Sequence, residues 1–229
     1  MNKNIILALV IFGIIGWHQN THSIEMKEKR TIQLPQPEHK GDLSVEEAIF
    51  NRQSRRSFKD APLKLPEISQ ILWAAGGKNV DTATGPSRTF PSAGGIYPQQ
   101  FYLSANKISG LDQGIYRYSW SKHQLILIKK GNYSQQLSAA ALGQQVVTQA
   151  PATIIITALY EKTTQKYGQR GEKYVLIDTG FAGENIYLQS ESLGLATVAV
   201  GAFSEQEVSK ILDLETTQTP LLIMPIGKK

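Results

Sequence analysis

The longest predicted helix limits the fold more than any other feature of this sequence. The segment "RGEKYVLIDTGFAGENIYLQSESLG", residues 170–194, is typical of one long helix that Gly194 closes. Strand-like segments precede and follow it, and helices and strands elsewhere are mixed without strict alternation. This order predicts an α+β fold in a single domain. The other expected helices cover residues 44–50, 65–77, 133–147 and 204–212, and the expected strands cover 101–105, 114–120, 124–128, 151–160, 196–203 and 220–227.

The composition is typical of a globular domain and excludes several kinds of functional site. Hydrophobic residues make up 41% and charged residues 19% of the 229 residues. The chain has no cysteine, which excludes disulfides, thiolate metal sites and a cysteine nucleophile. The four histidines are scattered without a metal-binding spacing, so we expect no metal site. The net charge of +5 comes from scattered basic residues, which suits an anionic small ligand and gives little reason to expect nucleic-acid binding.

An apolar segment near the N-terminus indicates export. The segment "IILALVIFGIIGW", residues 5–17, carries no charge and follows Lys3. Its length is typical of the core of a secretory signal and is short for a bilayer-spanning helix. We therefore predict a signal peptide or N-terminal membrane anchor at 1–23, a polar linker at 24–42, and a domain at 43–229 that lies outside the cytoplasm. A hydrophobic first helix that docks on the fold is the alternative.

A basic segment follows the first predicted helix of the domain. In "NRQSRRSF", Arg52, Ser54 and Arg56 occupy every second position, so an extended backbone would place their side chains on one face. Two guanidinium groups and a hydroxyl on one face suit a phosphate, since arginine binds phosphate bidentately. A solvated basic turn explains the same residues.

Two turns rich in small residues bring backbone close to the surface. Pro91, Ser92, Ala93, Gly94 and Gly95 precede a strand, and glycine there allows the backbone to approach a flat ligand. The Ser92 hydroxyl can donate a hydrogen bond to that ligand. In the second turn, Gly201 and Ala202 end a strand just before a capped helix, where free N–H groups can face an acceptor. Ordinary turns are the alternative in both places.

The segment "KYGQRGEKY", residues 166–174, places several cations and tyrosines at the start of the long helix. A cation there opposes the helix dipole, a small cost that a positively charged site would justify. A mobile basic loop is the alternative. The sequence has no GxSxG, P-loop or strand-linked GxGxxG motif, and no pair of carboxylates stands out. An enzyme built this way would borrow its reactive group, and a redox cofactor is the natural candidate.

Taken together and in order, these segments resemble the FMN-dependent nitroreductase superfamily. Within it the chain is most similar to the SagB-type, or thiazole/oxazole oxidase-like, dehydrogenases. The resemblance covers residues 44–227. It rests on R-x-S-x-R at 52–56, "ISQILWAAGG" at 68–77, "PSAGGIYP" at 91–98, "GIYRY" at 114–118, "KYGQRGEKY" at 166–174, "NIYLQ" at 185–189 and "GAF" at 201–203.

The resemblance implies a nitroreductase-like fold, with a central mixed, mainly antiparallel sheet flanked by helices, and FMN as the cofactor. It implies that Arg52, Ser54 and Arg56 bind the phosphate of FMN and that residues 91–95 line the isoalloxazine ring. Gly201 and Ala202 would then approach flavin N5. Members of the family are typically homodimers with each flavin at the subunit interface.

The resemblance also implies a mechanism. Hydride would pass through flavin N5 between a small-molecule donor and a small-molecule acceptor in a ping-pong sequence. A Lys-Tyr pair is implicated in proton abstraction in the azoline-oxidising branch, which indicates Lys166 and Tyr167 here, with Lys173 and Tyr174 as the second choice. Two other functions remain open at this point: a flavin-binding module without turnover, and an azoline oxidase that acts on peptides.

Overall fold

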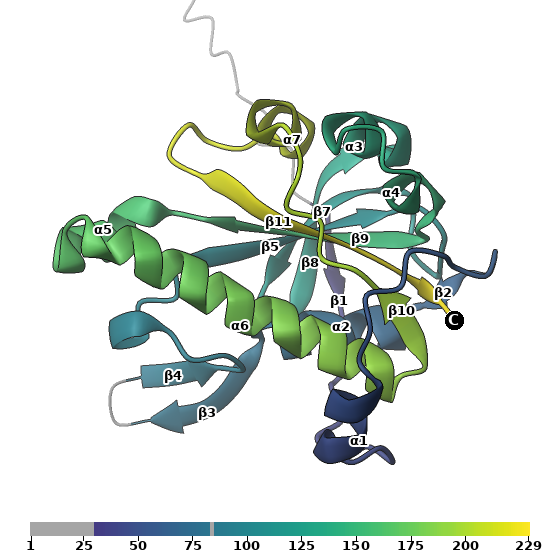
Figure 1. Ribbon diagram of the computed structural model, residues 1–229, viewed down its shortest axis with the longest axis horizontal. Helices are drawn as coiled ribbons and strands as arrows, with labels where there is room; N and C mark the ends of the chain where they lie inside the picture. The colour runs from purple at the N-terminus through teal and green to yellow at the C-terminus, as the bar shows by residue number, and fades with distance from the viewer. Residues whose placement is uncertain (1–29, 83–84) are drawn as a thin grey trace, which may run out of the picture.

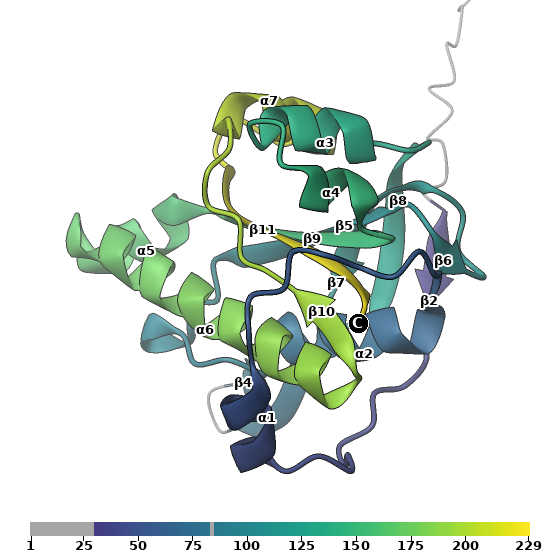
Figure 2. The same ribbon diagram turned by 45° about the vertical axis from the view of Figure 1, so that its right-hand side comes forward.

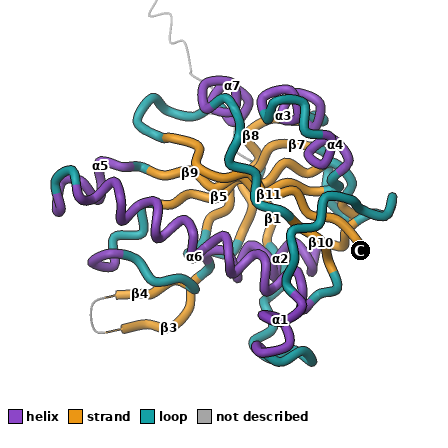
Figure 3. The backbone as a smooth tube through the Cα atoms, in the orientation of Figure 1, coloured by secondary structure: helices purple, strands orange, loops and turns teal. Residues whose placement is uncertain are grey.

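A seven-stranded antiparallel sheet forms the centre of the molecule. The computed structural model describes residues 30–82 and 85–229. Every neighbouring pair in the sheet is antiparallel, which confirms the predicted α+β class (Figures 1 and 3). In spatial order the strands are β1 (Thr31–Gln33), β8 (Gln124–Lys130), β7 (Gly114–Ser119), β5 (Gln99–Ala105), β9 (Ala152–Ala158), β11 (Thr219–Lys228) and β10 (Leu195–Thr197).

Helices cover both faces of this sheet (Figure 2). On one face lie α2 (Leu65–Gly76) and the long α6 (Arg170–Ser192), and on the other lie α3 (Ser134–Ala140), α4 (Gln145–Gln149) and α7 (Glu205–Leu212). The remaining elements are α1 (Val45–Asn51), α5 (Tyr160–Tyr167), the 3-10 turn η1 (Ala93–Gly95), the parallel pair β2 (Leu63–Lys64) and β6 (Ile108–Ser109), and the hairpin of β3 (Lys78–Thr82) and β4 (Gly85–Arg88).

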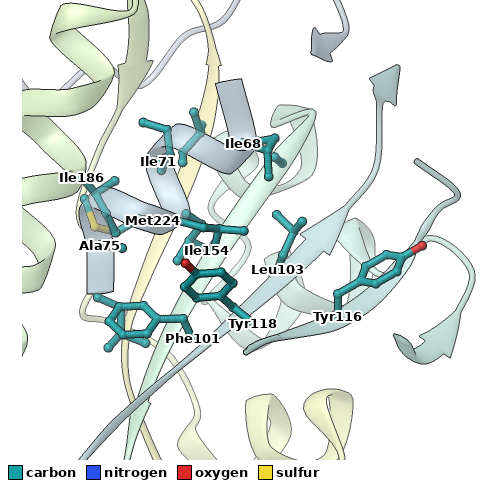
Figure 4. Packing of buried hydrophobic residues seen from close by; sticks show 14 of the residues in the cluster. Ile68, Ile71, Ala75, Phe101, Leu103, Tyr116, Tyr118, Ile154, Ile186 and Met224 are labelled. Carbon is teal, nitrogen blue, oxygen red and sulfur yellow. The ribbon is translucent and has the colours of Figure 1, made fainter. Parts of the chain in front are cut away.

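Side-chain alternation along the central strands explains the two-layer core. Ile154 and Ile156 of β9 belong to the cluster under α2 and α6, and Ile155 belongs to the cluster under α3, α4 and α7. Figure 4 shows Ile68, Ile71 and Ala75 of α2 packed over Leu103, Ile154 and Met224. Each fully buried isoleucine stabilises the fold by about 1.5–3 kcal/mol, so α2 is held firmly on the sheet.

Helices α1 and α7 begin at capping serines, Ser44 and Ser204. Ser44 and Glu47 form a reciprocal capping box at the start of α1. Helix α6 follows the predicted long helix closely. The predicted helix at 133–147 divides into α3 and α4, because Leu142 and Gly143 have φ values of 58° and 78°.

Several sequence-based expectations need correction. The loop at 78–95 contains the β3–β4 hairpin, and residues 160–167 form a separate helix that the sequence did not indicate. The strand expected at 196–203 begins one residue earlier and is regular only over Leu195–Thr197, and Val200 adds one isolated bridge to Ile223. Part of the expected linker at 24–42 belongs to the domain, since β1 pairs with β8 and Leu34 is buried.

The predicted signal peptide or anchor at 1–23 lies outside the described residues. Across the described parts of the chain, no helix combines the length and the apolar character needed to cross a membrane.

Candidate functional site

The residues after α1 gather around one tyrosine of α6. Ser54 Oγ lies 2.8 Å from Tyr187 Oη, and the Arg52 guanidinium carbon lies 5.2 Å from the centre of the Tyr187 ring. Arg55 turns away, with its N–H on Thr197 O and its guanidinium on Glu191. The segment is therefore extended with alternating side chains. We call Arg52, Ser54 and Tyr187, together with Arg56 two residues further along the same segment, the Tyr187 cluster.

The charges of this cluster are only partly compensated. Arg52 Nε is 3.8 Å from Glu184, a long and half-exposed ion pair. Arg56 is exposed and has neither an ion pair nor a side-chain hydrogen bond among the described residues. Lys229 and Arg55 share the buried carboxylate of Glu191 nearby. One cation, Arg56, is thus free to bind an anion from outside.

The turn at Gly201 and Ala202 lies beside the Tyr187 cluster. The N–H of Ala199 donates to Tyr187 Oη at 2.8 Å, which joins this segment to the cluster. Gly201 and Ala202 are exposed, and neither N–H donates to another group within the described part of the chain. Gln144 holds the Ala202 carbonyl at 3.2 Å. The turn therefore offers two unused donors.

The loop of residues 91–95 is attached to α6 by a buried carboxylate. Ser92 Oγ donates to Asp178 Oδ2 at 2.6 Å and accepts from the N–H of Tyr97 at 2.9 Å. The N–H of Ala93 also donates to Asp178 Oδ2, at 3.3 Å. The Ser92 hydroxyl hydrogen is therefore used within the protein. This corrects the expectation that Ser92 donates it to a ligand.

Two glycines give this loop its shape. Gly94 and Gly95 have φ values of 64° and 67°, a region that favours glycine. A Cβ on Gly94 would lie 2.6 Å from Tyr167 Oη and 2.8 Å from Lys166 Nζ, whereas a Cβ on Gly95 would meet nothing within 4 Å. The loop backbone thus lies directly against the end of α5. The structure brings together two segments that the sequence singled out independently.

Aromatic rings and cations continue from this contact. The Tyr174 ring packs edge-on against Tyr167, with centroids 5.1 Å apart, and the Arg170 guanidinium carbon lies 5.8 Å from the Tyr174 centroid. Within the described residues, neither Lys166 nor Arg170 has a carboxylate at ion-pair distance. Burial raises the pKa of Asp178, and its hydrogen bonds from Ser92 and Ala93 oppose that rise. We call residues 91–95, Lys166, Tyr167 and Asp178 the loop cluster.

The two clusters lie on opposite margins of α6. Asp178 and Tyr187 are nine residues apart on this helix, which is two and a half turns, or about 14 Å along the axis and half a turn around it. Figure 1 shows the loop between β4 and β5 on one side of α6 and the segment after α1 on the other. The predicted site residues therefore form two groups within one chain.

An apolar surface separates the two groups. On α6, Leu176, Ile177 and Phe181 are 54%, 51% and 45% exposed, and α1 adds Val45, Ile49 and Phe50. A hollow of about 360 Å³ between α1, α2 and α6 is lined by Trp73, Asn185 and Leu188 among others and includes none of the predicted site residues. This hollow is thus not the pocket that the sequence predicted.

Sequence reasoning missed two residues that organise the clusters, Asp178 and Tyr187. Each lies within the long predicted helix at a position that looks like ordinary helix sequence. The motif "NIYLQ" contained Tyr187 but gave no sign of its contact with Ser54. Asp178 is the more visible in hindsight, because a lone acid on the buried face of a helix needs a partner.

Comparison with known proteins identifies the family. The model of the Nitroreductase family matches residues 49–228. MJ1384 of Methanocaldococcus jannaschii, named as a nitroreductase, is 38% identical over 204 residues, which is 89% of this chain and 99% of that protein. TfxC, a trifolitoxin operon protein of Rhizobium leguminosarum bv. trifolii, and McbC, a microcin B17-processing protein of Escherichia coli, are each 24% identical over 79% and 61% of this chain, and the match spans 54% of each.

Solved structures of similar fold include proteins of this family. A crystal structure titled as a nitroreductase of Ralstonia eutropha has a TM-score of 0.75 at 28% identity, over 87% of this chain and 90% of that one. The NADPH:FMN oxidoreductase of Vibrio harveyi has a TM-score of 0.57 at 17% identity, over 80% of this chain and 68% of that one. The microcin synthetase McbBCD complex of Escherichia coli has a TM-score of 0.67 at 19% identity, over 96% and 84%. This chain belongs to the nitroreductase family of flavin-dependent oxidoreductases.

Proposed function

We propose that this protein is an FMN-dependent oxidoreductase of the SagB type, which passes hydride from a donor to an acceptor in two separate half-reactions. One observation carries the proposal. The loop of residues 91–95 packs so closely on Lys166 and Tyr167 that a Cβ on Gly94 would displace the ends of both side chains. A ligand lying on that loop would have an ammonium and a phenol hydroxyl at its edge.

The Tyr187 cluster fits the phosphate of FMN. Tyr187 Oη accepts from Ala199, so its hydrogen is available to Ser54 Oγ, and the Ser54 hydrogen is then available to a phosphate oxygen. Arg56 is uncompensated, and Arg52 is held loosely by Glu184. A charge-assisted hydrogen bond contributes about 1.5–3 kcal/mol, so two arginines are enough to secure a phosphate.

The loop cluster fits the ring of FMN. Gly95 has open space around its missing Cβ, and Gly94 and Gly95 are exposed, so flat backbone is available for a planar group. The flavin, once bound, supplies the hydride-accepting and hydride-donating chemistry. The protein residues supply orientation, positive charge from Lys166, and a barrier to water.

We propose that a second copy of this chain completes the site. The two clusters lie on opposite margins of α6, and the apolar surface between them is formed by residues of α6 and α1. A two-fold dimer across that surface would place the loop cluster of one chain against the Tyr187 cluster of the other. It would also remove Leu176, Ile177 and Phe181 from water. Dimers are frequent in this family, which supports the arrangement.

Lys166 and Tyr167 are the proposed catalytic residues. Lys166 Nζ has no carboxylate partner within the described residues, so it holds an uncompensated charge next to the loop. In a dehydrogenation the neutral amine form of Lys166 would take the proton that accompanies hydride loss and become the ammonium beside the reduced flavin, with Tyr167 Oη holding the substrate in line. Tyr174 packs edge-on against the Tyr167 ring. We therefore assign the second pair, Lys173 and Tyr174, a supporting role and not a catalytic one.

An azoline oxidase acting on peptides is the second candidate. It is favoured by the likeness to McbC, which is named for microcin B17 processing, and by the Lys166–Tyr167 contact with the loop. The chain spans about half the length of McbC and TfxC, so this activity is a separate proposal. The proposed exported location depends on residues 1–23 and is tested by a C-terminal reporter that is active only in the cytoplasm, where reporter activity would contradict export.

The test is anaerobic titration of purified protein with FMN, followed by reduction with a panel of donors that includes NADH, NADPH and a reduced quinone. We expect one FMN per chain, bleaching by at least one donor, and reoxidation by a quinone or nitroaromatic acceptor. Lys166→Ala should retain FMN but slow one half-reaction by about 100-fold, the usual range for a lost proton-transfer group. Lys162→Ala, an exposed lysine of the same helix, is the matched control.

Three results would overturn parts of this proposal. Folded protein without affinity for FMN would overturn it entirely. Bound flavin that no donor and acceptor can cycle would favour a binding module. Unchanged half-reactions in Lys166→Ala would remove this lysine from the chemistry.

A further inference from the structure

Asp178 is a carboxylate in an unusual position. It is only 3% exposed, on the α6 face that meets the loop of residues 91–95. No lysine, arginine or histidine of the described residues lies within ion-pair distance of it. A buried carboxylate without a cation is costly, so its retention needs a reason beyond packing.

The hydrogen bonds of Asp178 have a fixed direction. The N–H of Tyr97 donates to Ser92 Oγ, so the Ser92 hydrogen is given to Asp178 Oδ2, and the N–H of Ala93 can only donate. Both bonds end on the same oxygen, Oδ2. The other oxygen, Oδ1, accepts no hydrogen bond from the described residues.

The helix turn that carries Asp178 is itself anchored. Gln99 Nε2, at the start of β5, donates to Val175 O at 3.1 Å and to Thr179 Oγ1 at 3.4 Å. The loop is therefore tied to the same turn of α6 at two places, through Asp178 at residues 92 and 93 and through Gln99 just beyond its end. Asp178 cannot shift without moving the loop.

We propose that Asp178 is a positioning residue that fixes the flavin loop, and that its charge lowers the reduction potential of FMN held on that loop. The proposal rests on the proposed function. Hydride transfer adds two electrons and a proton to oxidised flavin, so the ring gains one negative charge. A carboxylate beneath the loop repels that charge in a poorly screened site, and this repulsion makes the reduced flavin a stronger donor.

Lys166, which lies against Gly94 of the same loop, acts in the opposite sense. Its ammonium would stabilise the reduced flavin. The potential would then reflect a balance between Lys166 and Asp178. Burial raises the pKa of Asp178, so its charge is best tested at pH 8, since alkaline pH favours the ionised carboxylate.

Asp178→Asn separates the two roles. Because both hydrogen bonds end on Oδ2, an asparagine oxygen in that place keeps them and only the charge is lost. Asp178→Ala loses both bonds as well. Asp60→Asn is the matched control, since the Asp60 side chain is 95% exposed and its ion pair is with Lys107, which belongs to neither cluster.

The measurement is the midpoint potential of bound FMN at pH 8, together with the FMN dissociation constant and amide hydrogen exchange of the flavin-free protein. For Asp178→Asn we expect FMN affinity within about threefold of wild type, but a tenfold rise in the ratio of the oxidised to the reduced dissociation constant, equal to about +30 mV for a two-electron couple. For Asp178→Ala we expect weaker FMN binding and faster exchange at Ala93 and Tyr97.

Unchanged potential in Asp178→Asn, equal to that of Asp60→Asn, would overturn the charge role. Unchanged exchange and affinity in Asp178→Ala would overturn the positioning role. Should Asp178→Ala fail to fold, rescue of folding and of FMN binding by asparagine supports positioning, and failure of asparagine to rescue overturns it. Wild-type protein that binds no FMN would instead refute the proposed function, which is a separate outcome.

Discussion

The Tyr187 cluster and the loop cluster are built on opposite physical principles. The first uses long, partly exposed cations, Arg52 and Arg56, around a tyrosine that is hydrogen-bonded on both sides. The second presents exposed loop backbone that Asp178 holds in place, with Lys166 and Tyr167 at its edge. The first suits a compact anion with strong local charge, and the second suits a wide, flat and neutral surface.

Because the two clusters differ in this complementary way, we propose that they are halves of one site. A phosphate clamp without a platform would bind any phosphate, and a platform without a clamp would bind any flat molecule weakly. FMN has both features on one molecule. Because the halves lie on opposite margins of α6, their cooperation depends on the apolar surface between them. A substitution at that surface should therefore have the largest effect on FMN binding.

The largest effect is expected from Ile177→Asp, at the centre of the exposed face of α6. A charge there would be buried in the proposed dimer, at a cost of several kcal/mol, so the protein should become monomeric. FMN affinity should fall by about 100-fold or more, although neither cluster has been altered. Light scattering and flavin titration measure the two effects. Val80→Asp is the control, an equally exposed apolar residue on β3.

A monomeric Ile177→Asp variant with full FMN affinity would show that one chain holds the whole site. That result would contradict the division into halves.

The next largest effect is expected from Gly94→Ala. Its Cβ would displace Lys166 Nζ and Tyr167 Oη and would also occupy a strained φ, so turnover should fall by about tenfold or more. Gly95→Ala has the same backbone strain with open space around the Cβ, so it isolates the clash. Stopped-flow reduction of bound flavin measures both variants. Equal losses in the two would mean that contact with Lys166 and Tyr167 is irrelevant.

An effect of similar size, on cofactor affinity instead of turnover, is expected from Arg56→Ala, which sharpens the role of the Tyr187 cluster. Loss of one charge-assisted bond to phosphate should weaken FMN binding by roughly 10- to 100-fold with unchanged thermal stability. Arg55→Ala should lower thermal stability and leave FMN affinity unchanged, since Arg55 pairs with the buried Glu191 and points away from the Tyr187 cluster. Isothermal titration with FMN and with riboflavin separates the phosphate contribution. If Arg56→Ala and Arg55→Ala changed FMN affinity and thermal stability alike, the side chains of residues 52–56 would not alternate between ligand and protein as described.

The smallest effect concerns stability and pH in the loop cluster. Burial raises the pKa of Asp178, so the folded state holds this proton more tightly than the unfolded state. The resulting stabilisation is complete below the ordinary pKa of 3.8 and is lost as pH rises through the raised value. Asp178→Asn cannot ionise. The difference between its free energy of unfolding and that of wild type should therefore shift in favour of the variant as pH rises from 4 to 7. Urea unfolding of both proteins at each pH checks this, and parallel curves would contradict it.

Much of the fold could be predicted from local signals. Ser44 with Glu47 and the periodic apolar residues of α2 mark helices that form where expected, because capping and burial are decided within a few residues. The strand β1 could not be predicted, since "TIQL" is short and polar and gains its structure by pairing with β8 across the sheet. The break at Leu142, in contrast, has a local signal that could have been used, since Gly143 follows it with a positive φ typical of a helix end.

The candidate site was predictable in its parts and not in its arrangement. Arg52 and Ser54 were placed on one face by the period of an extended strand, and Gly94 by its conformational freedom. The contact of Gly94 with Lys166 joins residues far apart in sequence, and nothing local announces it. The partners beneath each cluster, Asp178 and Tyr187, depend on the rotation of α6, which only the packed structure defines.

The most direct test of the central claim is complementation between two defective chains. Arg52→Ala/Arg56→Ala destroys the phosphate half, and Gly94→Val destroys the platform half, so each homodimer should bind no FMN. A purified mixed dimer would contain one site made of two intact halves, or about a quarter of all sites in a random mixture of the two chains. We predict one FMN per mixed dimer, with reduction by the same donor as wild type. A mixed dimer that binds no flavin would contradict a site shared between chains.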